Sequence, residues 1–302
     1  MNVLDLFSGC GGISEGFRQE GFEAKGFVEY WKPAIDTYLA NFPEAKLVCR
    51  DVTKFNFSAL LDGYDVIVGG PPCQGFSMAG KRKVGDKRNT LFEYYLKFVE
   101  KVNPSVCVME NVKGIYTMEA NDGELIWKKI VKGFEGIGYK VRAKVLNAAN
   151  YGTPQNRERV IFIAAKDEKL IVFPDWIKEK VFVKDVLDLP YEPIEELDHV
   201  YCKSKKNFVR AHYLKEGDCY STFHSAGKKL KIDGYAPTIT KSGRFIHPRF
   251  NRFLSVRECA RIQGFPDSFK FCGNIGNKYG QIGNAVPVTL AKAIAKKIKE
   301  AI

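Results

Sequence analysis

Short apolar runs and amphipathic segments alternate through residues 1–165, and this alternation constrains the fold more than any other feature of the sequence. The apolar runs have the length of buried parallel strands, and the segments between them repeat apolar residues at the three- and four-residue steps of helices. Alternation of this kind predicts a doubly wound α/β domain. The strands are expected at 3–7, 26–29, 46–49, 65–68, 106–109 and 160–164, and the helices at 13–19, 33–41, 90–101, 124–134 and 288–301.

The composition is that of an ordinary globular protein, with 302 residues of which 45% are hydrophobic and 27% charged. A disordered or fibrous chain is therefore not expected. The sequence has no apolar run of about 18 residues and no signal peptide at its start, so we expect a cytoplasmic protein without a membrane partner. The eight cysteines are widely spread and form no C-x-x-C pair. This spacing predicts reduced thiols and no metal site.

Positive charge gathers in the last third of the chain. Segment 199–257, here called the basic block, holds 13 Lys or Arg, three acids, all four histidines and several aromatic residues, whereas 185–198 has six acids and no base. This composition favours a nucleic-acid partner, with a merely solvated basic face as the alternative. The charge step predicts a domain boundary. We expect an α/β domain at 1–167, a smaller basic domain at 168–250, and a segment at 251–302 that returns to the first domain.

Glycines and acids follow the first three expected strands. Ligands of open α/β sheets bind outside the carboxyl ends of the strands. The glycine-rich turn at 8–12 would let a ligand approach the backbone, Glu29 is placed for two ribose hydroxyls, and Asp51 is placed for an adenine amino group. Together these residues predict an adenosine site. Taken singly, each acid could equally cap a helix or lie at the surface, and the glycines could form a plain turn.

A thiol and a carboxyl group follow the next two expected strands. Cys73 comes directly after two prolines, which place it in a stiff loop, and Glu110 follows the next strand. At adjacent strand ends, these groups can act as nucleophile and proton donor across one small substrate. A lone cysteine is, however, more often a small buried residue. Further on, Arg157 and Arg159 either aim a guanidinium at a substrate oxygen or belong to a charged turn.

Six motifs in this order resemble those of the DNA (cytosine-5)-methyltransferases. The run Pro-Pro-Cys-Gln-Gly-Phe-Ser at 71–77 is highly specific in this context, and Gly-Asn-Ala-Val at 283–286 also fits. The resemblance covers nearly the whole chain outside about 168–245. The six motifs lie at 5–12, 70–77, 110–112, 155–159, 252–267 and 281–286.

The resemblance implies a Rossmann-like, S-adenosylmethionine-dependent methyltransferase domain with a target-recognition domain that corresponds to the basic block. It implies that Cys73 attacks carbon 6 of a cytosine flipped out of double-stranded DNA. Glu110 would contact the N3 edge of the base and Arg159 its oxygen, with Arg157 in a supporting role. The residues implied around S-adenosylmethionine are Phe7, Gly9, Gly11, Glu29, Asp51, Pro71, Leu91, Asn284 and Val286.

Double-stranded DNA is the expected partner, and the protein would then associate with the nucleoid. A monomer would suffice, and a genetically paired restriction endonuclease is compatible with the family. Three alternatives are a tRNA cytosine-5 methyltransferase, a non-catalytic DNA-binding regulator and a nicotinamide oxidoreductase. The tRNA branch usually departs from the Pro-Pro-Cys motif after its Gln, which this chain does not. A regulator would be expected to lack Cys73 or Glu110, and an oxidoreductase to have a complete glycine fingerprint.

Overall fold

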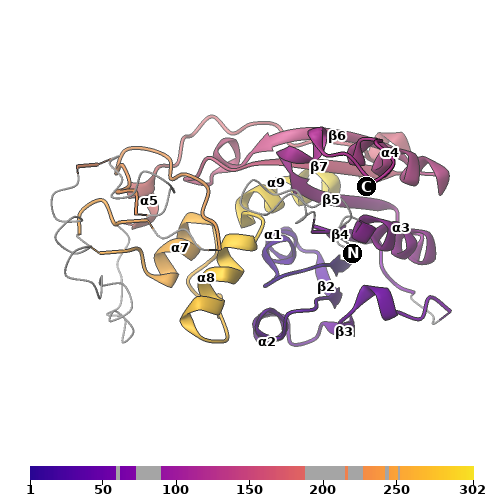
Figure 1. Ribbon diagram of the computed structural model, residues 1–302, viewed down its shortest axis with the longest axis horizontal. Coiled ribbons are helices and arrows are strands. Elements are labelled where there is room, and N and C mark those ends of the chain that lie inside the picture. Colours follow the sequence, from indigo (N-terminus) through magenta and orange to yellow (C-terminus); the bar gives the residue numbers. More distant parts are fainter. Residues whose placement is uncertain (59–61, 73–89, 188–214, 217–226, 242–244, 251) are drawn as a thin grey trace. The chain divides into compact units, whose positions relative to one another are not determined.

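The chain forms two compact units, drawn in Figure 1. The computed structural model describes residues 1–58, 62–72, 90–187, 215–216, 227–241, 245–250 and 252–302. The first unit comprises 1–146, 158–175 and 291–302, and the second comprises 147–157 and 176–290. Residues 251–290 therefore group with the second unit, whereas the sequence analysis assigned them to the first domain. The functional division at 167 and 250 stays a prediction, since most of 188–226 lies outside the described residues.

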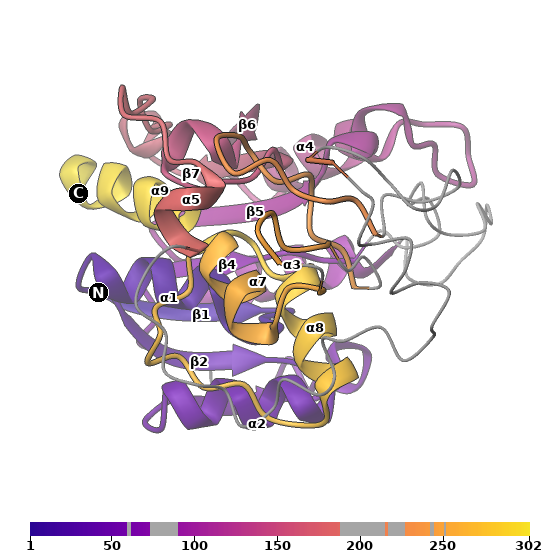
Figure 2. The same cartoon turned by 90° about the vertical axis from the view of Figure 1, so that its left-hand side faces the viewer.

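The first unit is built on a sheet of seven strands among the described residues, in the order β3-β2-β1-β4-β5-β7-β6. Neighbouring strands from β3 to β5 run parallel, and β7 runs antiparallel to β5. Figure 2 shows β1 beside β2. All six expected strands are present, which confirms the α/β class. The strands are β1 (Asn2–Leu6), β2 (Glu23–Val28), β3 (Lys46–Cys49), β4 (Val66–Gly69), β5 (Val106–Val112), β6 (Lys140–Asn147) and β7 (Glu158–Ala165).

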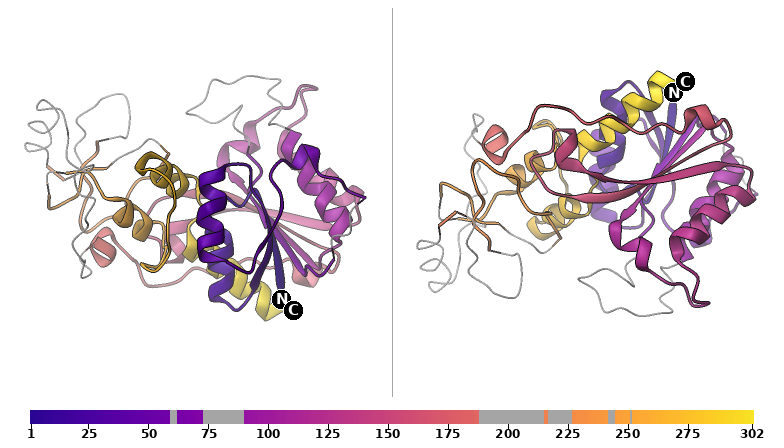
Figure 3. Two further views of the ribbon diagram at one scale, coloured as in Figure 1. Left: turned by 90° about the horizontal axis from the view of Figure 1, so that it is seen from below. Right: turned by 90° about the horizontal axis from the view of Figure 1, so that it is seen from above.

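Helices cover both faces of this sheet. Figure 3 shows α1 and α9 on one face and α3 and α4 on the other. From β1 the chain passes to β2 and β3 on one side, and it later passes to β4 and β5 on the other side. The carboxyl ends of β1 and β4 therefore form a topological switch point, where open α/β sheets bind ligands. The helices are α1 (Gly12–Gln19), α2 (Lys32–Asn41), α3 (Leu91–Val102), α4 (Ile126–Gly136) and α9 (Val288–Ala301).

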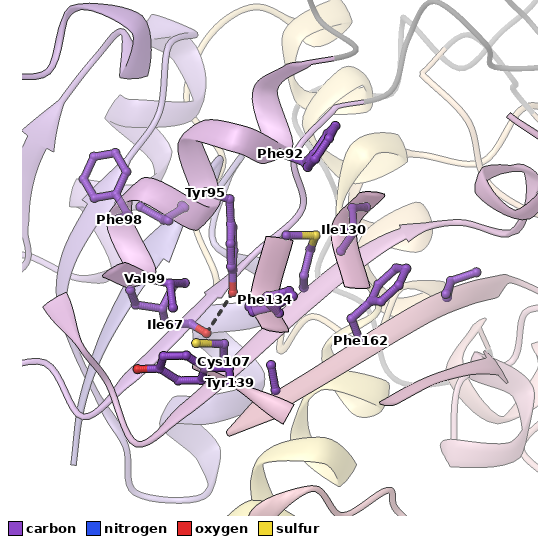
Figure 4. Close-up of a cluster of buried hydrophobic side chains, with 14 of the residues drawn as sticks. Ile67, Phe92, Tyr95, Phe98, Val99, Cys107, Ile130, Phe134, Tyr139 and Phe162 are labelled. Carbon is purple, nitrogen blue, oxygen red and sulfur yellow. Dashed lines mark hydrogen bonds between the residues drawn. The ribbon is translucent and has the colours of Figure 1, made fainter. Parts of the chain in front are cut away.

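A cluster of buried aromatic and aliphatic side chains joins α3 and α4 to the sheet (Figure 4). Tyr95 and Phe134, one from each helix, meet edge to face with ring centroids 6.2 Å apart. The Tyr95 hydroxyl lies 3.1 Å from the carbonyl oxygens of both Ile67 in β4 and Val108 in β5, so it can donate to either. This packing fixes the two neighbouring strands that position Pro71 and Glu110. Pro71 follows β4, whereas Glu110 lies inside β5, which extends three residues beyond its expected end at 109.

The second unit is mostly helix and irregular chain in its described part. Its helices are α5 (Val183–Leu187), α7 (Val256–Ile262) and α8 (Ile275–Asn284). α7 begins with a capping box, in which Ser255 Oγ accepts from the Glu258 N–H and the Glu258 carboxylate accepts from the Ser255 N–H. Arg252 adds two hydrogen bonds of 2.7 Å to the same carboxylate. The C-terminal motifs are therefore organised by their own capping and ion-pair contacts.

Candidate functional site

The turn after β1 lies at the switch point and is held in a backbone conformation that favours glycine. Phe7 has φ of +57° and Gly11 has φ of +96°, both in the left-handed region. A Cβ on Gly11 would lie 2.8 Å from a ring carbon of Phe42, so only glycine fits there. The Ser8 N–H donates to the Val28 carbonyl, which ties the turn to β2. The glycines singled out in the sequence therefore form a close-packed turn that leads into α1.

Glu29, directly after β2, is the acid best placed beside this turn. Its carboxylate accepts hydrogen bonds from the Gly9 N–H at 2.8 Å and the Trp31 N–H at 2.7 Å. Burial raises the pKa of Glu29, and the backbone N–H donors partly offset this effect. Each carboxylate oxygen can accept more than one hydrogen bond, so the group can still receive hydroxyl donors. Tyr30, which the sequence analysis passed over, is 75% exposed next to this acid.

Asp51 follows β3 and has the capping role that the sequence left open as an alternative. Its Oδ1 accepts from the Thr53 N–H at 3.0 Å and from the Thr53 hydroxyl at 2.7 Å, at the start of the short helix η1 (Val52–Lys54). These hydrogen bonds lower the pKa of Asp51. The carboxylate is therefore charged and fixed in position, which is compatible with a second role towards a ligand. Leu91, the first residue of α3, is partly buried against the core.

Asp5 lies within β1 and is wholly buried. Its Oδ2 accepts from the Ser14 hydroxyl at 2.6 Å, and the Ser14 oxygen lies 2.7 Å from the Tyr38 hydroxyl. Burial raises the pKa of Asp5 to about 7. This chain of hydrogen bonds joins β1 to α1 and α2 under the turn. The sequence placed Asp5 in a motif but gave it no structural role.

The carboxyl ends of β4 and β5 approach each other closely. A Cβ on Gly70 would lie 2.7 Å from Glu110 Oε2, so the backbone after β4 runs against this carboxylate. Asn111 Nδ2 donates to the Pro71 carbonyl at 3.1 Å, which fixes the segment that leads to the predicted nucleophile. Cys73 itself lies outside the described residues, two positions beyond Pro71.

Glu110 and Arg159 form an ion pair across the antiparallel strands β5 and β7. Arg159 Nε lies 2.7 Å from Glu110 Oε1, and the two side chains are 13% and 14% exposed. The strand register pairs Val112 with Arg159 and Glu110 with Ile161. A carboxyl group and a guanidinium are therefore held together at the strand end next to Pro71. The carboxyl group can donate or accept a hydrogen bond at the edge of a planar polar ring, and the cationic guanidinium can donate one.

Arg157, two residues before Arg159, has a different environment. It belongs to the second unit and is buried, and its guanidinium donates to the carbonyls of Ile239, Gly283 and Ala285. The second unit also holds two residues implied in cofactor binding, Asn284, which is exposed, and Val286, which is buried. The two arginines of the motif therefore belong to separate hydrogen-bond networks.

Several of the described cysteines are kept in the unreactive thiol form by burial. Burial raises the pKa of Cys10 and of Cys107 well above the usual thiol value, and raises that of Cys49 to about 11. Within the described part of the chain, no group of three or more His, Cys, Asp or Glu is placed to hold a metal ion. No helix described by the structure has the length and apolar character that a membrane crossing needs.

Comparisons with known proteins give one consistent result. A family model described as C-5 cytosine-specific DNA methylase matches residues 1–300. The chain is 36% identical to the type II methyltransferase M.FnuDI of Fusobacterium nucleatum, over 100% of this chain and 95% of that protein. It is 32% identical to the type II methyltransferase M.DdeI of Desulfomicrobium norvegicum, over 99% of this chain and 88% of that protein. A solved structure from an E. coli prophage, assigned as a DNA modification methyltransferase, is similar with a TM-score of 0.83, 30% identity and 99% coverage of both chains.

Proposed function

Because the chain belongs to the C-5 cytosine-specific DNA methylase family and is a DNA (cytosine-5)-methyltransferase, we propose a covalent mechanism for it. In this mechanism, Cys73 forms an adduct with carbon 6 of a cytosine that is flipped out of a specific duplex sequence. The observation that carries the proposal is the Glu110–Arg159 ion pair, which lies against the backbone leading to Cys73. A nicotinamide oxidoreductase and a non-catalytic DNA-binding regulator have no comparable support.

The proposed reaction begins at Cys73 because carbon 5 of cytosine is a poor nucleophile. A thiolate that adds to carbon 6 breaks the C5–C6 double bond and turns the ring into an enamine, so that electron density moves to carbon 5. After carbon 5 has gained its methyl group, a base removes the carbon 5 proton. The electron pair of that C–H bond reforms the double bond and expels the Cys73 thiolate.

Glu110 and Arg159 would act on the polar edge of the same base. As the thiolate adds, negative charge develops at N3 and at the carbonyl oxygen of the base. Glu110 in its acid form can donate a hydrogen bond to N3, and the Arg159 guanidinium can donate to the oxygen. Both side chains are already held in one place by strands β5 and β7, so each needs to move little to reach the base.

The residues after β1, β2 and β3 fit an adenosine-containing cofactor. Glu29 offers a fixed carboxylate for ribose hydroxyls, Tyr30 offers an exposed ring for an adenine face, and Asp51 offers a charged acceptor for an amino group. S-adenosylmethionine, when bound, supplies the methyl group. In the proposed site the other binding residues are Phe7, Gly9, Gly11, Pro71, Leu91, Asn284 and Val286.

The cytosine must leave the base stack before these groups can reach it, and unstacking costs a few kcal/mol. We assign the compensating phosphate contacts to the basic block, whose positive charge suits a DNA backbone. Bisulfite sequencing of DNA from cells that express the chain tests the proposal. Protected cytosines should occupy one position of one recurring sequence. Unprotected DNA from cells with an intact, soluble protein would contradict it.

Segment 175–245 is expected to determine which sequence is methylated, with the α/β unit supplying only the chemistry. Base-reading side chains differ between enzymes with different targets, and this segment lies outside the shared motifs. Replacing it with the corresponding segment of a relative that has another target should transfer that target. The reciprocal exchange is the matched control. Active chimeras that keep the targets of their α/β units would show that specificity is determined elsewhere.

Salt dependence tests the charge argument independently of the family. If the basic block makes roughly 6–10 phosphate contacts, non-specific affinity should fall by about 10³–10⁵ between about 50 and 200 mM salt. Lys231 is exposed and Lys228 and Lys229 are partly exposed. Changing all three to Gln should lower the slope of log affinity against log salt by up to about one unit for each lysine that contacts a phosphate.

The control for this experiment removes the same charge from α9, by changing Lys292, Lys296 and Lys299 to Gln. That variant should keep the original salt slope. Equal slopes for the two triple variants, with the fold intact by circular dichroism, would assign Lys228, Lys229 and Lys231 to a solvated surface away from DNA.

The curated relatives above are named type II methyltransferases, a class that acts with a restriction endonuclease. We extend this role to the chain as a proposal, with a monomer bound to the DNA of the nucleoid. DNA modified by the chain should resist an endonuclease that recognises the methylated sequence. Cleavage of fully modified DNA at that sequence would contradict the pairing, and light scattering of the purified protein would test the monomer.

A further inference from the structure

Three buried polar side chains form a hydrogen-bonded network inside the second unit. They are Gln155, Arg157 and Gln263, with exposed fractions of 0%, 2% and 0%. Buried polar groups are costly unless they are hydrogen-bonded, and a buried hydrogen-bond network favours one arrangement of the chain around it. The segments that this network joins therefore have a defined relative position.

Arg157 binds the two carbonyls that flank Asn284. Its Nη2 donates to the Gly283 oxygen at 3.0 Å and to the Ala285 oxygen at 2.9 Å. Its Nη1 donates to the Ile239 oxygen at 2.8 Å. The planar guanidinium thus joins the end of α8 to the backbone at residue 239. Lysine has no such fork and cannot make the same set of contacts.

The two glutamines complete the network. Gln155 donates to Gln263 Oε1 at 2.8 Å and accepts from the Ile239 N–H at 2.8 Å. Gln263 donates to the Ile282 carbonyl at 2.7 Å. Both backbone polar groups of Ile239 and three carbonyls between 282 and 285 are therefore held by this network.

Gly283 brings the two backbone segments into direct contact. A Cβ at this position would lie 2.4 Å from the carbonyl carbon of Thr240 and 2.5 Å from the Lys241 nitrogen. Any side chain here would push the end of α8 away from residues 240–241 of the basic block. The close approach at Gly283 and the hydrogen bonds of the Arg157 guanidinium thus both hold segment 283–285.

We propose that Arg157 is a positioning residue for the cofactor segment 283–286, which it fixes so that Asn284 and Val286 can bind S-adenosylmethionine, and that it does not contact the cytosine. The proposal rests on the proposed function, which places Asn284 and Val286 at the cofactor. It separates the roles of Arg157 and Arg159, which the sequence alone presents as a pair. Gln155 and Gln263 support the same segment.

The test measures the affinity of S-adenosylhomocysteine for the full chain by titration calorimetry, without DNA, together with steady-state kinetics. Arg157→Lys should weaken this binding and raise the KM for S-adenosylmethionine by about ten- to a hundredfold, the range typical of residues that orient ligands of a metal site. The kcat at saturating cofactor should change by less than about threefold.

The matched control is Arg261→Lys in the same unit. Arg261 is also buried, and it makes hydrogen bonds of 2.8 and 2.7 Å to the Asp267 carboxylate. This variant should lower thermal stability by a similar amount without changing cofactor affinity. Equal losses of affinity in the two lysine variants, or a loss in neither, would overturn the positioning role. Gly283→Ala disturbs the same segment through its contact with Thr240 and Lys241, and it decides the question if Arg157→Lys does not fold.

Asn284→Ala separates this inference from the proposed function. If it weakens S-adenosylhomocysteine binding while Arg157→Lys does not, the inference fails and the cofactor site stands. If it has no effect, Asn284 is not a cofactor ligand, and the contrast between Arg157→Lys and Arg261→Lys still decides whether Arg157 positions the rest of the segment. In the double variant, the effects of Arg157→Lys and Asn284→Ala should be less than additive, because both act through one segment.

Discussion

Cys73→Ala should reduce methyl transfer by at least about 10⁴-fold, which corresponds to about 5 kcal/mol of barrier height. Without the thiolate, carbon 5 of the cytosine is not converted to an enamine carbon and has little affinity for an electrophile. The binding of DNA and of S-adenosylhomocysteine should change little. Rates from single-turnover assays with labelled S-adenosylmethionine on duplex DNA provide the measurement.

The control for this variant is Cys272→Ala, which removes a partly exposed thiol of the second unit. That variant should methylate DNA at nearly the original rate. If Cys73→Ala kept more than about a tenth of the activity, or if Cys272→Ala lost as much, Cys73 would not be the nucleophile.

Glu110→Gln should lower kcat by about 10²–10⁴-fold, the usual contribution of a positioned general acid. Glutamine has the same shape as glutamate, but it cannot transfer a proton to N3 and carries no charge to pair with Arg159. The affinity for S-adenosylhomocysteine should be preserved because Glu110 is not among the proposed cofactor ligands. The kcat and the KM for both substrates check this prediction.

Glu158→Gln is the matched control, since Glu158 lies on β7 and forms an exposed ion pair of 2.9 Å with Lys113. Exposed pairs of this kind contribute about 0–1 kcal/mol, so this variant should behave nearly as the unaltered protein. A similar loss of kcat in both variants would assign the effect to general electrostatics. Full activity of Glu110→Gln would remove the acid from the mechanism.

The buried parallel strands could be predicted because each is a short apolar run, and their helices because apolar residues repeat with helical spacing. Strand β6 was not expected. Its exposed Lys140, Arg142 and Lys144 alternate with partly buried Val141 and Ala143, as in a strand at a sheet edge. A search for apolar runs misses this two-residue period. The helices α7 and α8 were likewise not expected, although α7 and the end of α8 lie inside recognised motifs. Their short apolar faces are interrupted by polar residues.

The position of the candidate site was predictable, since carboxyl ends of neighbouring parallel strands meet at one edge of a sheet. This rule brings Glu29 beside the turn after β1, as the structure shows. The separate environments of Arg157 and Arg159 were not predictable. The carbonyls that bind Arg157 belong to residues 82, 126 and 128 positions away, and no local pattern marks them. Contacts of this kind depend on tertiary packing.

Duplex DNA with 5-fluorocytosine at the target position tests the central claim most directly. Fluorine on carbon 5 cannot leave as a cation, so the reaction should stop after methyl transfer with the base still bonded to the nucleophile. Mass spectrometry of the digested complex should then find the base on the peptide that contains Cys73, and the Cys73→Ala protein should form no complex. A bond to Cys10, Cys49 or Cys107, or complete turnover of the fluorinated target without any adduct, would contradict the account.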